Sequence, residues 1–132
     1  MFSDSLGNVF VAHIYRNRYL AIATNSRAHT LQFLDHNKLM FAIATFDRNV
    51  KIVSSVGKTE EVLKGHQKKV TKIEVNYTKQ MFFTMSKDSV NLWNLKNFRR
   101  IRTLFPRKDA FIDCVFSKSG DYLISRFEVV HS

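Results

Sequence analysis

Three short segments of the sequence repeat one pattern about 40 residues apart, and this repeat constrains the fold more than any other feature. The segments are Phe41–Asp47, Phe82–Asp88 and Tyr122–Glu128. Each begins with an aromatic residue, continues through a mostly apolar stretch and reaches an acidic residue six positions later. A fixed period of this length indicates a chain of repeated supersecondary units, each of which buries its apolar face against its neighbours.

A second series of segments precedes the first at similar distances. It comprises Thr30–Phe33, Lys72–Val75 and Asp113–Phe116, in which polar and apolar residues alternate. Alternation of period two predicts strands with one buried face. Two further alternating runs, Val50–Val53 and Val90–Trp93, follow the first two acidic residues. Each unit therefore holds four short strands in roughly 41 residues, a spacing typical of the blades of a β-propeller.

The predicted fold is all-β and antiparallel: a partial β-propeller of about two full four-stranded blades and two half blades. We expect blade segments at 5–24, 28–64, 65–104 and 110–128, within a single repeat segment that spans residues 1–132. The first half blade would contain only outer strands, and the last would lack its third and fourth strands. Because a closed propeller typically needs about four to eight blades, we expect a fragment, or a chain that needs further blades or another chain to close. Unpaired edges predict aggregation or oligomerisation of the isolated chain.

The segment 65–104 resembles a WD40 repeat. Gly65-His66 opens it, and Leu92-Trp93-Asn94 stands where such repeats carry Trp-Asp. In that family a His, a Ser or Thr, an Asp and a Trp form a hydrogen-bonded chain across the blade. The resemblance assigns these roles to His66, Ser86, Asp88 and Trp93. The residue types suit such a chain, because an indole N–H only donates, a carboxylate only accepts and a hydroxyl does both.

The preceding repeat departs from this pattern. It keeps Thr45 and Asp47, but Val53 stands near the Trp position and Asn25-Ser26 replaces Gly-His. We expect the hydrogen-bonded chain to be broken there, so that packing holds this blade.

The same four residue types could also make a His-Ser-Asp hydrolase site. No nucleophile elbow or oxyanion-hole glycine pattern surrounds Ser86, and no second ligand stands at a recognised metal-binding distance from His66. The sequence therefore favours a structural network, with no metal, no cofactor and no enzymatic activity.

A closer resemblance extends over residues 5–127. It is carried by Gly7–Val11, Ile43–Asp47, Leu63–His66, Asp88–Leu95 and Lys96–Arg102. These segments are similar to the early propeller blades of the WD-repeat-containing member of the TBC-domain family. That resemblance implies a non-catalytic protein-interaction scaffold in the cytoplasm, at the centrosome, centriolar satellites or ciliary base. It does not bring GTPase-activating chemistry, because no arginine here matches the TBC catalytic motif.

The net charge of +10 bears on partners rather than on the fold. Basic residues gather around the Gly-His turn and the fourth strand of the same repeat: Lys64, Lys68, Lys69, Lys72, Arg99, Arg100 and Arg102, followed by Arg107 and Lys108. Three interpretations remain open: a solvated edge that deters strand pairing, contact with an acidic protein such as a cytoskeletal surface, or electrostatic binding of nucleic acid or phosphate. The aromatic residues lie at core positions rather than among the basic ones, which makes nucleic acid the weakest of the three.

The remaining features concern the compartment. The single cysteine, Cys114, lies in an apolar run and is predicted to be an inert core thiol in a reducing environment. No apolar run reaches the roughly 18 residues that a membrane span needs, and the first residues lack the features of a signal peptide. We therefore expect a cytoplasmic chain with no membrane span.

Overall fold

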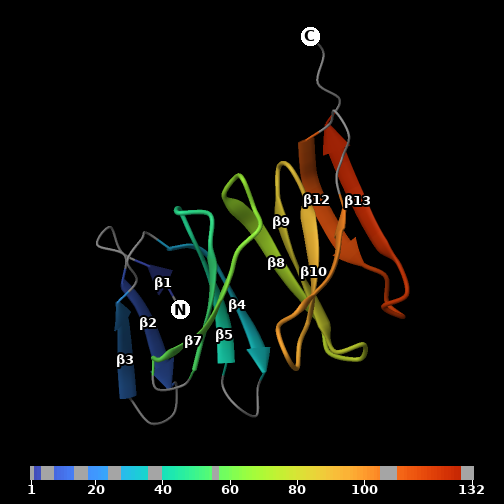
Figure 1. Ribbon diagram of the computed structural model, residues 1–132. Coiled ribbons are helices and arrows are strands. Elements are labelled where there is room, and N and C mark those ends of the chain that lie inside the picture. Colours follow the sequence, from blue (N-terminus) through green and yellow to red (C-terminus); the bar gives the residue numbers. More distant parts are fainter. Residues whose placement is uncertain are drawn as a thin grey trace.

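The computed structural model describes residues 2–3, 8–13, 18–23, 28–35, 40–54, 57–104 and 110–128. These residues form four antiparallel sheets and no helix. Figure 1 shows the sheets side by side in chain order, from blue to red, as the blades of a propeller. The predicted all-β partial propeller is confirmed, and the four sheets are here called blades 1 to 4.

Blades 2 and 3 are complete. Blade 2 contains β4 (Ala28–Asp35), β5 (Met40–Thr45), β6 (Val50–Val53) and β7 (Thr59–Leu63), hydrogen-bonded in that order. Blade 3 contains β8 (Val70–Asn76), β9 (Met81–Ser86), β10 (Val90–Asn94) and β11 (Arg100–Leu104), also in chain order. Each strand pairs with the next along the chain, because short turns join antiparallel neighbours.

Blades 1 and 4 have fewer strands in the described residues. Blade 1 pairs β1 (Phe2–Ser3) with β2 (Asn8–His13) and β2 with β3 (Arg18–Ala23). The strand β1 lies ahead of the segment 5–24 that the sequence predicted, and it adds a third strand to this blade. Blade 4 is the hairpin of β12 (Ala110–Phe116) and β13 (Leu123–Glu128).

The second strand of each complete blade is buried on both faces, since it lies between two neighbouring blades. In β5, Phe41 and Ile43 pack toward blade 1, whereas Ala42 and Ala44 pack toward blade 3. In β9, Phe82 packs toward blade 2, whereas Phe83 and Met85 pack toward blade 4. This double burial explains why these strands read as continuous apolar runs rather than as alternating ones.

The core is consequently three layers of side chains between blades rather than one central cluster. The layer between blades 2 and 3 has the most buried residues, and among them Trp93 stacks against Phe82 with ring centroids 6.4 Å apart. Between blades 3 and 4, Cys114 packs with Phe83, Met85 and Val90. Each layer needs a blade on both sides, so the units are stable only as a stack.

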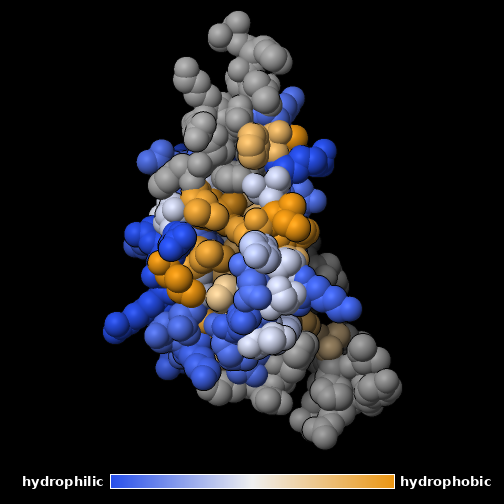
Figure 2. Space-filling view, turned by 90° about the vertical axis from the view of Figure 1, so that its right-hand side faces the viewer, coloured by the Kyte–Doolittle hydropathy of each residue, from blue (hydrophilic) through white to orange (hydrophobic). Residues whose placement is uncertain are grey.

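The far face of blade 4 has no neighbouring blade in the described residues. Val115 and Ile124, which pair across β12 and β13, are 38% and 59% exposed. Figure 2 shows apolar surface gathered on this side of the molecule. Exposed contiguous apolar surface of this kind marks an interaction or aggregation surface.

Candidate functional site

The predicted network residues come from four different elements of blade 3. His66 lies in the connection between β7 and β8, Ser86 ends β9, Asp88 lies in the following turn and Trp93 is on β10. The connection can approach the blade closely because residue 65 is a glycine with φ of 137°. A Cβ atom there would lie 3.1 Å from a guanidinium nitrogen of Arg100 and would be strained by that φ.

The structure brings the four predicted residues together, but it links them through a fifth. His66 Nδ1 lies 3.0 Å from the hydroxyl of Ser86, which in turn hydrogen-bonds the carboxylate of Asp88. Trp93 does not reach Ser86. Its indole N–H donates instead to Thr84 Oγ1 at 2.9 Å, and the same oxygen lies 2.7 Å from His66 Nε2. The hydrogen-bonded chain of side chains therefore runs from Trp93 through Thr84, His66 and Ser86 to Asp88.

The hydrogen bonds of this chain share one direction. Thr103 donates to Oδ1 of Asn91 at 2.6 Å, which leaves the Asn91 amide nitrogen to donate to His66 Nε2 at 3.2 Å. Nε2 is thus an acceptor, and the proton of a neutral His66 lies on Nδ1 and points to Ser86. Each group from Trp93 onward donates to the next, and the chain ends at a carboxylate, which only accepts.

Burial reinforces the neutral form of the imidazole. Thr84 and Ser86 are fully buried, and His66 is 9% exposed. Desolvation is the main reason why the pKa of His66 is lowered from 6.5, with a smaller lowering effect from Arg100, whereas Asp88 acts to raise it. The Ser86 hydroxyl is fully buried and donates its proton to the half-buried carboxylate of Asp88, so it is not placed to act as a nucleophile activated by His66. This geometry is that of a structural tie between the Gly-His connection and the blade.

Sequence reasoning missed Thr84, the residue that joins His66 to Trp93. A signal for it was present: Thr84 stands two positions before Ser86 on β9, so both hydroxyls lie on one face of the strand. Strand register completes the placement, because Thr84 pairs with Asn91 on β10. Only the pairing of β9 with β10 shows which hydroxyl faces the indole.

Blade 2 keeps part of the same arrangement. The Thr45 hydroxyl hydrogen-bonds the carboxylate of Asp47, which also accepts from the backbone N–H of Asn49 at 3.2 Å. Val53, near the Trp position, is buried and packs toward blade 1. Asn25 and Ser26, in place of Gly-His, lie outside the described residues. The turn between β5 and β6 is thus tied as in blade 3, while the Trp position contributes packing only.

The seven basic residues of the predicted contact surface lie in several places. Lys64, Lys68 and Lys69 are exposed in the connection between β7 and β8, and Arg100 reaches this connection at Gly65. Arg102 pairs with Leu92, whose side chain packs toward blade 4, so it lies on the opposite face of β11 from Arg100. Arg99 is exposed immediately before that strand, and Arg107 and Lys108 lie outside the described residues.

Lys72 is engaged within the propeller. Its ammonium group lies 2.7 Å from Asp113 and 3.5 Å from Glu74, and it donates to the carbonyl oxygen of Cys114 at 2.8 Å. Lys69 has a different contact: its Nζ lies 5.1 Å from the ring centroid of Phe46 in blade 2. The basic residues that group around the Gly-His connection are therefore Lys64, Lys68, Lys69 and Arg100, here called the basic loop surface.

Among the residues that the structure describes, no group of three or more His, Cys, Asp or Glu side chains could hold a metal ion. In the same part of the chain, no helix has the length and apolarity that crossing a bilayer requires.

Comparisons with known proteins show which proteins this chain resembles in sequence and in fold. No protein-family model matches the sequence. The chain is 34% identical over 116 residues to TBC1 domain family member 31 of Xenopus laevis, a match that covers 86% of the chain and 11% of that protein. The human protein of the same name is 32% identical over 117 residues, with the same coverage of both chains. In the crystal structure of the C-terminal WD40 domain of Sif2, an equivalent fold covers 93% of this chain and 36% of that one, with a TM-score of 0.74 at 20% identity. The chain has the fold of a WD40-repeat β-propeller.

As a WD40 segment, the chain spans only about a tenth of the curated relatives that it matches. The predicted resemblance to the WD-repeat-containing member of the TBC-domain family is confirmed. The WD40 fold also explains the network: the chain of Trp93, Thr84, His66, Ser86 and Asp88 ties the loop before the first strand of the blade to its second and third strands.

Proposed function

We propose that this chain is part of a non-catalytic WD40 scaffold that binds other proteins at the centrosome, the centriolar satellites or the ciliary base. The observation that carries the proposal is the similarity to TBC1 domain family member 31, which extends over 86% of the chain. The fold supports the same function class, because WD40 propellers generally serve as rigid platforms for protein partners.

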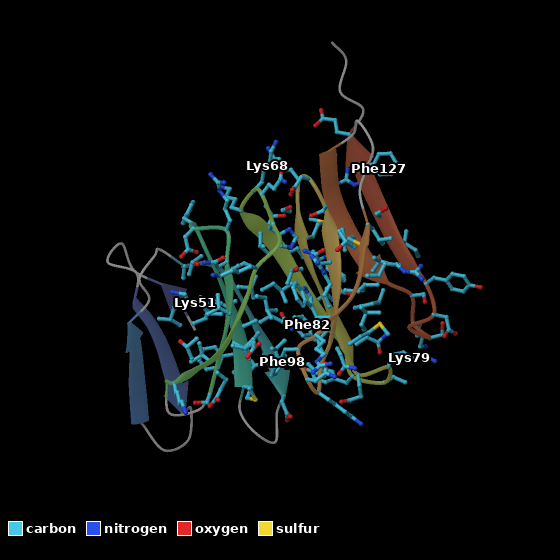
Figure 3. All side chains as sticks on the ribbon, in the orientation of Figure 1. Lys51, Lys68, Lys79, Phe82, Phe98 and Phe127 are labelled. Carbon is cyan, nitrogen blue, oxygen red and sulfur yellow. The ribbon has the colours of Figure 1, made fainter. Side chains whose placement is uncertain are left out.

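The basic loop surface is the proposed contact for an acidic protein partner. Lys64 and Lys68 are exposed, and neither makes an ion pair with a described residue. In Figure 3, Lys68 projects from the end of blade 3. A cluster of positive charge on an exposed loop attracts acidic surfaces and accelerates their encounter with it.

Localisation in ciliated cells tests the proposal. The tagged chain should concentrate with centriolar markers, and the double variant Lys64→Glu/Lys68→Glu should do so less well. A matched double variant, Lys58→Glu/Lys118→Glu, removes the same charge from two exposed lysines elsewhere and should behave as the native chain. A uniform cytosolic distribution of the native chain would contradict the proposed centriolar or ciliary site of action.

Electrostatic binding of nucleic acid or phosphate is the second candidate, and the net charge of +10 is the observation that favours it. The two functions differ in their response to salt, because each nucleic-acid phosphate contact makes affinity fall log-linearly with salt concentration. A mobility-shift assay with DNA and RNA at low salt separates them. The scaffold proposal predicts no shift, whereas a salt-sensitive shift abolished by Lys64→Glu/Lys68→Glu would favour the second function.

A further inference from the structure

A pocket of about 650 Å³ lies at the junction of blades 2 and 3. It is formed where β4 and β7 of blade 2 meet the turns that precede β9 and β11 of blade 3. Phe98, which lines it, lies at the end of the blades away from Lys68 (Figure 3). The pocket is therefore separate from the basic loop surface, and its volume falls in the range of roughly 300–1,000 Å³ that is usual for ligand sites.

The inner part of the pocket is apolar. Leu34 and Leu95 are buried there, and Met40 and Phe98 are partly buried against the same layer of the core. The ring of Phe98 packs edge-on against the ring of Phe82, with ring centroids 6.3 Å apart. The backbone N–H of Phe98 donates to the carbonyl oxygen of Asn94 at 2.8 Å and closes the turn. An apolar side chain that enters the pocket would extend the core between the two blades.

The rim of the pocket is acidic, in a chain whose net charge is strongly positive. Glu60 and Glu61 are exposed on β7, and neither makes an ion pair with a described residue. Other carboxylates of the described residues are already engaged: Glu74 and Asp113 with Lys72, Asp121 with Lys79, and Asp47 and Asp88 with turn residues. Glu60 and Glu61 thus offer negative charge beside an apolar site.

The position of β7 favours an extended ligand. It is the outermost strand of its sheet, so one edge of its backbone faces away from β6. An extended peptide can lie along such an edge while a side chain enters a neighbouring pocket.

We propose that this pocket binds a short peptide segment of a partner protein in which an apolar side chain of the size of Leu or Phe is flanked by Lys or Arg. The apolar side chain occupies the space beside Leu34, Leu95 and Phe98, and the basic side chains pair with Glu60 and Glu61. The assignment rests on the scaffold function proposed above and adds the chemistry of one class of partner. The basic loop surface would take an acidic partner at the other end of the blades.

Fluorescence anisotropy with the full chain tests this assignment. The probe is a labelled ten-residue peptide with a central Leu-Phe pair and two basic residues on each side. Two companion peptides replace the basic residues with Glu or the Leu-Phe pair with Ser-Ser. The native chain should bind the probe and neither companion. Because exposed ion pairs contribute little individually, Glu60→Gln/Glu61→Gln should weaken binding roughly fivefold.

Two variants make the test specific. Lys96 also lines the pocket, and Lys96→Glu should tighten binding of the basic probe by removing repulsion. Glu128→Gln removes an exposed carboxylate at the end of β13 and should leave binding unchanged.

Equal affinity of the native chain and Glu60→Gln/Glu61→Gln, with native circular dichroism and melting for both, would overturn the pocket assignment. Centriolar localisation of the native chain would then still support the scaffold. A cytosolic distribution with intact, Glu60- and Glu61-dependent peptide binding would instead reject the proposed site of action alone.

Discussion

Lys72 and Asp113 hold equivalent positions in successive repeats, and their side chains meet across the junction of blades 3 and 4, with Nζ 2.7 Å from Oδ1. Although partial burial disfavours the ammonium, the hydrogen bond to Asp113 raises the pKa of Lys72. The same bond lowers the pKa of Asp113. A repeat that places opposite charges at one position of adjacent inner strands therefore ties neighbouring blades together.

A double-mutant cycle measures this tie. Lys72→Met and Asp113→Asn should each lower the free energy of unfolding, and the double variant should lose less than the sum of the two. The pair is partly exposed, so high salt should reduce the coupling. The folded pKa of Asp113 is depressed, so its contribution to stability is present above its ordinary pKa of 3.8 and is lost as pH falls through the lower folded pKa.

The more exposed pair of Lys79 and Asp121 serves as the comparison for the double-mutant cycle, with a smaller expected coupling. Additive effects for Lys72 and Asp113 would contradict the tie.

Thr84→Val tests the residue that joins the imidazole to the indole. Valine keeps the shape of threonine but removes the hydroxyl, which leaves the buried Trp93 N–H and His66 Nε2 without this partner. Unsatisfied buried groups cost about 1–3 kcal/mol, so urea denaturation should show a loss of roughly 2 kcal/mol. Thr59→Val changes an exposed threonine on β7 and should stay within about 0.5 kcal/mol of the native chain. Equal effects at the two sites would show that the Thr84 hydroxyl makes no net contribution.

The stability of the chain should depend on pH through His66. Its pKa in the folded state is lowered from the ordinary value of 6.5, so below pH 6.5 the unfolded state binds the proton more readily. Stability is therefore full above that pH, falls as the pH drops below it and levels off below the lowered folded pKa. Histidine side chains titrate between about pH 5 and pH 8. Unfolding midpoints measured over this range should depend less steeply on pH for His66→Gln than for the native chain. Parallel curves would exclude this role for the imidazole.

The exposed end face of blade 4 predicts self-association of the isolated chain. Ile124→Lys places a charge in the middle of this face and should shift sedimentation velocity profiles toward smaller species. Ile101→Lys makes the same change at a residue on β11 that is 52% exposed, and it should leave the profile unchanged. A native chain that is a clean monomer with cooperative melting would refute the expectation.

Cys114 should react slowly with thiol reagents. It is 1% exposed, and burial is the main cause that raises its pKa to about 11. Because the thiolate is the reactive form, native protein at neutral pH should be labelled much more slowly than denatured protein. Thr59→Cys adds an exposed thiol and should supply one fast-reacting equivalent in the native state. Fast labelling of both thiols would indicate that blade 4 opens readily.

Much of the fold could be predicted because propeller blades repeat in sequence as well as in space. The aromatic-to-acidic spacing of Phe41–Asp47 and Phe82–Asp88 located β5, β9 and the turns after them. The strand β1, which has two residues, was not predicted, because so short a strand carries no alternation. The pairing of Lys72 with Asp113 was likewise not predicted. The sequence groups Lys72 with other basic residues, and only the approach of β8 to β12 brings the carboxylate to it.

By itself the sequence determined the units of this protein: four-stranded blades, a Gly-His connection, and polar residues of the types that a buried network needs. It could do so because strand periodicity and residue type are local properties that can be read from neighbouring positions of the sequence. The tertiary structure alone decided which hydroxyl accepts the Trp93 hydrogen bond and which lysine forms an ion pair between blades. It also decided that Glu60 and Phe98 line one pocket. These relations depend on strand register and on the packing of blades against each other, which join residues far apart in the chain.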